Sequence, residues 1–182
     1  MQTTSDRVRL RRRWLLTVML ALTGVTLAAR TPPQTTPAAK PTPHVLFLCP
    51  HGAAKSVLAS AYFQRAAKER GLNVRVESAG TDPDPAVAAA VAAHLTKNGY
   101  AIPIATPTKV TPAQLASADV VISMGCDLTG FPTPKGRVVR WDEVPGPSEN
   151  FAAADEAIRK RVTQLIEELV SAAAPRKKQR VS

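Results

Sequence analysis

Short apolar runs and longer amphipathic segments alternate through the middle of the chain. Continuous apolar runs at 44–48 and 119–123 are typical of strands that are buried on both faces of a sheet. Apolar and charged residues alternate over 74–77, and residues 138–141 form another short apolar run. This pattern predicts four strands.

Three segments between and after these runs have helical character. A segment over 54–70 closes on Gly71 and an alanine-rich segment over 85–98 closes on Gly99, and glycine commonly follows a helix end. Over 158–170 apolar residues recur at steps of three and four, which predicts a third, amphipathic helix. Strands separated by helices predict an α/β fold, with three layers (α/β/α) built around a four-stranded parallel sheet.

The two ends of the chain depart from this pattern. Arginines precede an apolar stretch over 14–29, which predicts that residues 1–29 are a signal peptide or an uncleaved N-terminal anchor. Residues 30–43 contain five prolines and predict an extended linker, and 175–182 form a basic tail, so the expected domain spans 44–174. We expect an exported protein, periplasmic or extracytoplasmic, or one that is anchored in a membrane by its N-terminal segment alone.

The high net charge belongs mostly to the ends. The whole chain carries a formal charge of +10, but the expected domain holds 13 basic and 13 acidic side chains and is neutral. A basic face is the electrostatic signature of nucleic-acid binding, so this distribution argues against a nucleic-acid partner. Hydrophobic content of 45% excludes a wholly disordered chain, and two cysteines exclude a disulfide framework. The sequence shows no metal-ligand cluster and no cofactor motif.

The turn after the first strand carries the candidate chemistry. A buried strand delivers Cys49 to the carboxyl edge of the sheet, where open α/β folds bind ligands. Backbone N–H groups and the helix dipole at the start of the next helix favour an anion, and the same field favours the thiolate of Cys49. Ser56 can donate a hydrogen bond to that thiolate. The predicted anion-binding loop, called the anion loop below, consists of Pro50, His51, Gly52, Ala53, Ala54, Lys55 and Ser56.

The order of motifs around this turn resembles the low-molecular-weight protein tyrosine phosphatases and the arsenate reductases that share their fold. The signature of that family is a cysteine, five residues and arginine-serine directly after the first strand, and Cys49 to Ser56 follow this spacing. Three further segments match in order: Ser-Ala-Gly-Thr at 78–81, the third strand at 118–124 and the acid-bearing loop at 141–147. The resemblance covers about 44–172 and implies that Cys49 is a nucleophile.

The anion loop departs from the family signature at three positions. Lys55 replaces the arginine, and an ammonium is a flexible point charge whereas a guanidinium holds two oxygens at once. Gly52 stands where the family has an asparagine in left-handed backbone, which glycine adopts easily. His51 replaces a glycine, and it either supports the thiolate when protonated or caps the loop.

The acid-bearing loop departs as well. The family's general acid is the aspartate of an Asp-Pro pair, and this chain has Gly146-Pro147 there. Asp142 is the nearest substitute, and its alternative role is that of an exposed loop acid. Cys126, after the third predicted strand, is either a redox partner of Cys49 or a small buried apolar residue.

These residues support three hypotheses about function. The first is a cysteine-dependent phosphatase that forms a phosphocysteine on Cys49, with Lys55 and Asp142 as further catalytic residues and a phosphorylated small molecule or phosphoprotein as substrate. The second is an arsenate reductase that uses the same nucleophile together with a thiol reductant. The third is an oxyanion-binding regulatory module with little turnover, because two catalytic positions are altered.

Overall fold

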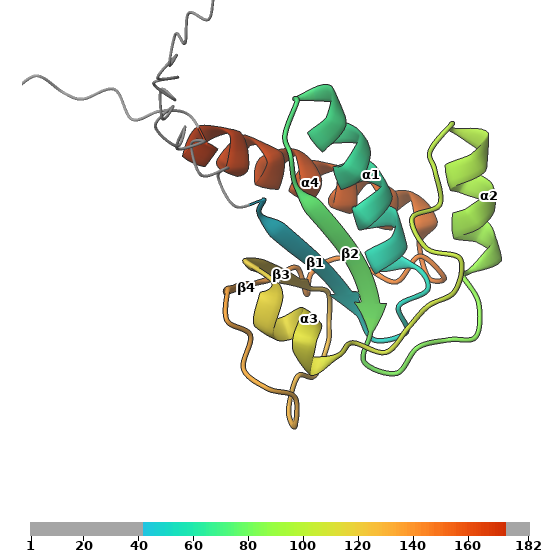
Figure 1. The fold of residues 1–182 in the computed structure, drawn as a ribbon. Helices are drawn as coiled ribbons and strands as arrows, with labels where there is room; N and C mark the ends of the chain where they lie inside the picture. The colour runs from blue at the N-terminus through green and yellow to red at the C-terminus, as the bar shows by residue number, and fades with distance from the viewer. Residues whose placement is uncertain (1–41, 174–182) are drawn as a thin grey trace, which may run out of the picture. The chain divides into compact units, whose positions relative to one another are not determined.

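The computed structural model describes residues 42–173, so the predictions for 1–29, for most of the linker and for 175–182 lie outside the described part. Strands and helices are interspersed along the domain (Figure 1). In chain order they are β1 (His44–Cys49), α1 (Lys55–Glu69), β2 (Arg75–Gly80), α2 (Ala89–Lys97), α3 (Pro112–Ser117), β3 (Val120–Ser123), β4 (Arg137–Arg140) and α4 (Phe151–Ala173).

The four strands form one parallel sheet in the order β2-β1-β3-β4. The predicted four-stranded parallel sheet is therefore confirmed. Strand β1 is buried at all six positions and lies between β2 and β3, which brings its carboxyl end to the middle of one sheet edge. Ligands of open parallel sheets bind at this edge.

Alternate residues of β1 enter two separate hydrophobic cores. Val45 and Phe47 pack into the core under α1 and α4, and Leu46 and Leu48 pack into a second core on the other face, where α3 lies (Figure 1). This alternation is what a strand with two covered faces requires, and it confirms the three-layer arrangement.

Helix α1 ends as its sequence predicts. Gly71 has a φ of +64°, and its N–H donates to the carbonyl of Lys68 while the N–H of Leu72 donates to that of Ala67. This pair of bonds satisfies the last carbonyls of the helix and stops it. The return of the chain to β2 is thereby fixed.

Two helices differ from the sequence-based prediction. Helix α2 begins at Ala89, not at 85, because hydrogen bonds from the N–H groups of Asp82, Asp84 and Ala88 to carbonyls of the anion loop hold the preceding segment against that loop. The short helix α3 was not predicted, although Thr111 and Gln114 form a capping box at its start. Within 42–173 no helix is both long enough and apolar enough to cross a membrane.

Candidate active site

The anion loop turns directly from β1 into α1. Cys49 ends β1 and is buried, with 3% of its surface exposed, and α1 begins at Lys55. The Cys49 Sγ and the Ser56 Oγ are 3.2 Å apart and hydrogen-bonded. The predicted nucleophile therefore lies beside a hydroxyl that can donate to its thiolate form.

Two glycines allow the anion loop to rest on the end of β2. Gly52 has a φ of +61°, in agreement with the left-handed backbone expected for it. A Cβ on Gly52 would lie 2.8 Å from the Gly80 nitrogen, and a Cβ on Gly80 would lie 2.7 Å from the Gly52 nitrogen. Both positions therefore exclude a side chain, and the backbone of the loop is held against β2.

Residues 82–88 clamp the anion loop from its outer side. The N–H groups of Asp82, Asp84 and Ala88 donate to the carbonyls of Pro50, His51 and Ala53 at 2.8, 3.0 and 3.0 Å. Because these three carbonyls are occupied from outside, the loop is fixed in shape before any ligand arrives.

The first turn of α1 offers donors to an anion. Its cap residue is Ala54, which makes no side-chain cap, whereas α3 has the Thr111 side chain as acceptor for its first turn. The opening amides of a helix without a capping side chain need another acceptor, and an oxyanion is a suitable one.

Lys55 bridges the anion loop and the acid-bearing loop. Its Nζ donates to the Val144 carbonyl at 3.3 Å, so the ammonium lies where the two loops meet. Gly146 lines the same pocket as Cys49, and the acid-bearing loop thus reaches the site without a carboxylate at that position.

Asp142 lies outside the pocket. Its carboxylate accepts a hydrogen bond from the Gly125 N–H at 2.9 Å and lies 3.6 Å from Arg140. These contacts assign it to the support of the turn after β3. Its predicted catalytic role gains no support from this position.

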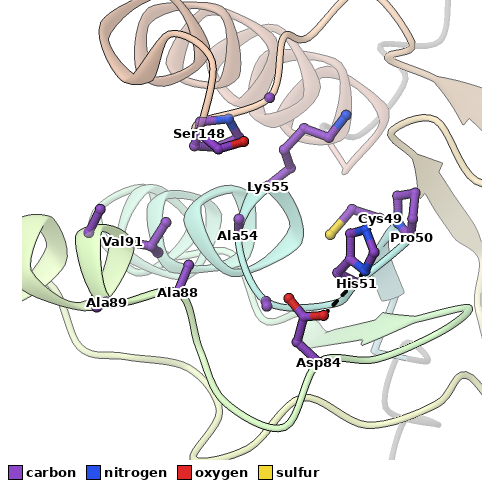
Figure 2. A pocket seen from close by; sticks show the side chains of 14 residues that line it. Cys49, Pro50, His51, Ala54, Lys55, Asp84, Ala88, Ala89, Val91 and Ser148 are labelled. Atoms are coloured by element: carbon purple, nitrogen blue, oxygen red, sulfur yellow. Dashed lines mark ion pairs between the residues drawn. The ribbon is translucent and has the colours of Figure 1, made fainter.

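A carboxylate that the sequence analysis did not single out does line the pocket. Asp84 Oδ1 lies 3.3 Å from the Nδ1 of His51, and both side chains are half-exposed or more (Figure 2). The repeated Asp-Pro of residues 82–85 marks a turn, but only the pairing of this segment with the anion loop reveals its place in the site.

The pocket is wide and has an apolar wall. Its volume is about 480 Å³, and it lies between the anion loop, the start of α2 and residues 146–148 (Figure 2). Ala88, Val91 and Pro147 contribute to its apolar lining, on the side of α2 and of residues 146–148. An oxyanion bound at Cys49 thus leaves room for a larger group.

A polar cluster anchors the α2 wall to the body of the domain. Tyr62 donates to Asp155 and contacts the Nε2 of His94, and Arg159 bonds to Asp155 at 2.9 Å and to the Tyr100 hydroxyl at 2.9 Å. Burial and the bond to Asp155 raise the pKa of Tyr62 well above its ordinary value. The cluster joins α1, α2 and α4, so the pocket wall is rigidly placed.

Cys126 is a second buried thiol near the site. Burial raises the pKa of its thiol to about 11, and the Cys49 sulfur acts on it in the same direction while Lys55 acts in the opposite one. Both cysteines are free thiols. Within residues 42–173, no three His, Cys, Asp or Glu side chains are arranged to hold a metal ion.

Comparison with known proteins agrees with this geometry. Residues 44–130 match the family model described as low molecular weight phosphotyrosine protein phosphatase. A Halobacterium salinarum protein named "Putative arsenate reductase" is 28% identical over 127 residues, which cover 67% of this chain and 89% of that protein.

Solved structures include both kinds of enzyme. The thioredoxin-dependent arsenate reductase of Corynebacterium glutamicum is 30% identical with a TM-score of 0.64, and the match covers 74% of this chain but only 65% of that one. A low molecular weight phosphotyrosine phosphatase of Vibrio cholerae is 21% identical with a TM-score of 0.62, covers 72% of this chain and 99% of that one, and shows the shared fold. The signature cysteine lies at the end of β1 and residues 44–130 match the family model, so the domain is similar to the low molecular weight phosphotyrosine protein phosphatases and to the arsenate reductases that share their fold.

Proposed function

We propose that the domain is an arsenate reductase in which Cys49 is the nucleophile and Cys126 the second thiol. The observation that carries this proposal is a second buried free thiol, Cys126, in the turn after β3, the strand that pairs with β1 where β1 ends at Cys49. Phosphoester hydrolysis by way of a phosphocysteine needs one thiol, whereas reduction of arsenate to arsenite needs two electrons, which two thiols supply as they form a disulfide. The relatives named above with at least 28% identity also carry the name arsenate reductase.

The proposed reaction uses the groups of the anion loop in order. The Cys49 thiolate attacks arsenic, an As–O bond breaks, and the departing oxygen leaves as water after taking up protons. The α1 amides and the Lys55 ammonium hold the remaining oxygens. The Cys126 thiol gives its proton to an oxygen on arsenic and its sulfur attacks the Cys49 sulfur, so that arsenic leaves as arsenite with the electron pair of the broken S–As bond. An external dithiol, such as the thioredoxin in the name of the Corynebacterium enzyme, then reduces the Cys49–Cys126 disulfide.

The altered acid-bearing loop is compatible with this substrate. A phosphate ester expels an alkoxide or phenoxide, which benefits strongly from a general acid. Hydrogen arsenate can expel an oxygen that already carries a proton. The loss of an aspartate at Gly146 therefore costs arsenate chemistry less than it costs ester hydrolysis.

The second candidate is the phosphatase that the sequence analysis places first. The apolar wall and the volume of about 480 Å³ favour it, because a bare oxyanion does not fill the pocket and an ester carries a further organic group. Cys49 would form a phosphocysteine that water hydrolyses, with Lys55 as the charge on the transferred group.

One set of variants separates the two functions. The full-length chain, Cys49→Ser and Cys126→Ser are assayed for arsenate-dependent oxidation of an added dithiol protein and for hydrolysis of an aryl phosphate. Reduction requires both cysteines, whereas hydrolysis requires Cys49 and survives Cys126→Ser. Asp127→Asn, at an exposed neighbour of Cys126, is the matched control and leaves both rates unchanged.

Two results contradict the proposal. Arsenate reduction that persists in Cys126→Ser excludes the two-thiol mechanism, and activity that persists in Cys49→Ser excludes both enzymes. Phosphate binding by calorimetry without any turnover supports the third hypothesis, a regulatory module that binds an oxyanion.

A further inference from the structure

We propose that His51 and Asp84 are the proton-donating pair of this site, in place of the aspartate that the acid-bearing loop lacks. The proposal rests on the proposed function, since it takes Cys49 as the nucleophile. In it, His51 is the catalytic residue that gives a proton to the departing oxygen, and Asp84 is a positioning residue that acts through the imidazole.

The pair occupies the pocket of the nucleophile. His51, Asp84 and Cys49 all line the cavity, and His51 is two residues from Cys49 in the same turn (Figure 2). The Nδ1 of His51 faces the carboxylate at 3.3 Å, which leaves Nε2 as the ring nitrogen outside the pair. A carboxylate on one nitrogen fixes the ring orientation and leaves the other ring nitrogen available to a substrate.

The backbone fixes the pair before substrate binds. The Asp84 N–H donates to the His51 carbonyl at 3.0 Å, and two more bonds of the same clamp lie on either side of it. The two residues are therefore joined through both backbone and side chain. Their side chains are 65% and 50% exposed, so a proton lost to the leaving group is readily replaced from water.

The other charged groups around the pocket have different partners. Lys55 donates to the Val144 carbonyl, Asp142 accepts from Gly125, and Glu143 pairs with Arg161 at 2.6 Å. Residues 146–148 line the pocket with glycine, proline and serine, none of which is an acid. Among the described residues that line the pocket, the titratable side chains are thus Cys49, His51, Lys55 and Asp84. Of these, His51 and Asp84 form a pair, in which the imidazole is the proton donor and the carboxylate is its fixed partner.

The proton transfer is balanced in both directions. As the Cys49 sulfur bonds to phosphorus or arsenic and the bond to the departing oxygen breaks, the Nε2 proton moves to that oxygen and His51 becomes neutral. In ester hydrolysis the neutral ring then accepts a proton from the water that attacks phosphocysteine, which restores the protonated pair. In arsenate reduction the ring regains its proton from solvent.

Leaving-group dependence is the first test. The full-length chain, His51→Gln, Asp84→Asn and the control Asp127→Asn are assayed on phenyl phosphate and on 4-nitrophenyl phosphate, whose phenoxide leaves without help. His51→Gln should lower kcat/KM on phenyl phosphate by about 10²–10³-fold and on 4-nitrophenyl phosphate by less than about 10-fold. Asp84→Asn should move the basic limb of the pH profile to lower pH, because the imidazolium loses its negative partner. Asp127→Asn changes an exposed carboxylate that does not line the pocket and should leave both unchanged. Equal losses on both esters, or an unmoved basic limb, overturn the proposal.

A second measurement needs no turnover. The His51 ring is followed by NMR, its signal being the one that is lost in His51→Gln, and is titrated with pH in the presence and absence of inorganic phosphate. Phosphate bound at the anion loop should raise the midpoint of this titration, and Asp84→Asn should lower it. A midpoint that does not respond to saturating phosphate overturns the proposal. A midpoint that responds in a chain that turns over neither arsenate nor ester upholds the pair while the proposed function fails.

Discussion

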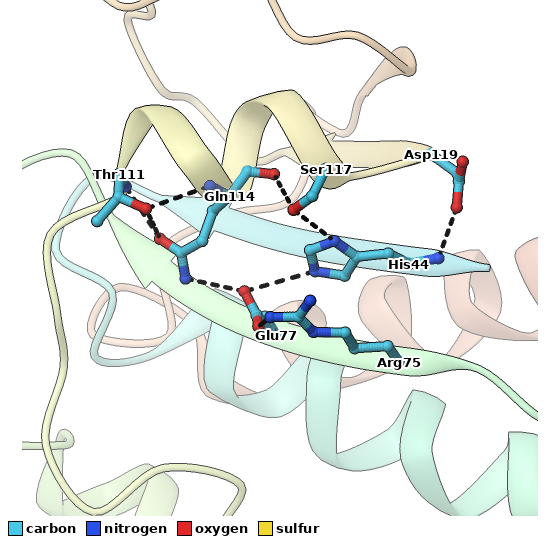
Figure 3. Close-up of polar contacts among 7 residues, drawn as sticks. All are labelled: His44, Arg75, Glu77, Thr111, Gln114, Ser117 and Asp119. Atoms are coloured by element: carbon cyan, nitrogen blue, oxygen red, sulfur yellow. Dashed lines mark hydrogen bonds and ion pairs between the residues drawn. The ribbon is translucent and has the colours of Figure 1, made fainter. Parts of the chain in front are cut away.

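The two ends of strand β1 hold polar groups in opposite ways. At the amino end, the buried His44 lies among polar partners: its N–H donates to Asp119 at 2.8 Å, its Nδ1 lies 3.3 Å from the Ser117 hydroxyl and its Nε2 lies 3.4 Å from Glu77 (Figure 3). Glu77 in turn accepts from Gln114 at 2.9 Å and from Arg75. At the carboxyl end, the α1 amides, the Cys49 thiol and the Lys55 ammonium keep hydrogen-bonding capacity toward the pocket.

The polar groups at the two ends of β1 thus serve different purposes, stability at the His44 end and function at the Cys49 end. Partners at the His44 end come from β2, α3 and the start of β3, so its polar groups join the elements of the sheet together. At the Cys49 end, residues 82–88 donate hydrogen bonds to the carbonyls of the anion loop. The N–H groups of the first turn of α1 stay available to a ligand. The polar groups at the His44 end thus face partners within the fold, whereas those at the Cys49 end retain hydrogen-bonding capacity for a ligand.

The largest expected effect tests the Cys49 end. Cys49→Ser removes the thiolate nucleophile and should lower turnover by about 10³-fold or more, while the free energy of unfolding changes by less than about 1 kcal/mol. His44→Asn, at the other end of the strand, should show the reverse: a lower unfolding free energy and an unchanged kcat. Steady-state kinetics measures turnover and urea unfolding measures stability on the same samples. A loss of turnover in both variants would contradict the difference between the two ends of β1.

The next effect concerns the contact between the loop and β2. Gly80→Ala places a Cβ 2.7 Å from the Gly52 nitrogen, so the loop must shift, and we expect a cost of about 1–3 kcal/mol together with weakened phosphate binding. Gly99→Ala is the control, because its φ is +68° but nothing lies within 4 Å of the added carbon. It should cost about 1 kcal/mol and leave phosphate affinity unchanged. Equal phosphate affinity in both variants contradicts the role assigned to the contact.

A smaller effect concerns the pH dependence at the His44 end. Hydrogen bonds from Gln114 and Arg75, together with the charge of His44, outweigh burial and hold the pKa of Glu77 below its ordinary value. Because the folded pKa is the lower one, this stabilisation is present above the ordinary glutamate pKa and is lost as pH falls through the folded pKa. Glu77→Gln should cost about 1–2 kcal/mol at neutral pH and should flatten this acid limb of the stability curve. Unfolding measurements on the unchanged chain and on Glu77→Gln, made between neutral and acidic pH, test this prediction. A difference in unfolding free energy between the two proteins that stays constant with pH contradicts it.

The smallest effect is at the exposed edge of the sheet. Arg137 and Glu168 pair at 2.7 Å, and their side chains are 50% and 57% exposed. Arg137→Ala should therefore cost less than about 0.5–1 kcal/mol and should affect neither activity nor the pH dependence. A loss of stability as large as that of Glu77→Gln would show that the exposed Arg137–Glu168 pair contributes as much as the part-buried contacts of Glu77.

Much of the fold is predictable because its signals are local. Uninterrupted apolar runs predict β1 and β3, and the three- and four-residue spacing from Ile158 onward predicts α4. Helix α3 was missed because it is six residues long with one buried side chain, Leu115, so only its capping box marks it. The first residue of α2 is set by bonds to another loop, which no periodicity records.

The candidate site likewise combines features that local sequence predicts with features that tertiary contacts decide. The place of Cys49 after a buried strand is a local feature, and so is the glycine at 52. Asp84 enters the pocket because residues 82–88 pair with the anion loop some 30 positions earlier, and Asp142 is kept out by a bond to Gly125. Both placements are decided by tertiary contacts, which no local sequence pattern records.

The clamp on the anion loop also determines how the site can be observed. The amide hydrogens of Asp82, Asp84 and Ala88 exchange with solvent only when their bonds to the loop carbonyls open. Their exchange rates therefore report the free energy of local opening of the loop itself, without substrate and without turnover. In any variant of the chain, the exchange rates of these three amides therefore show whether the anion loop keeps its structure.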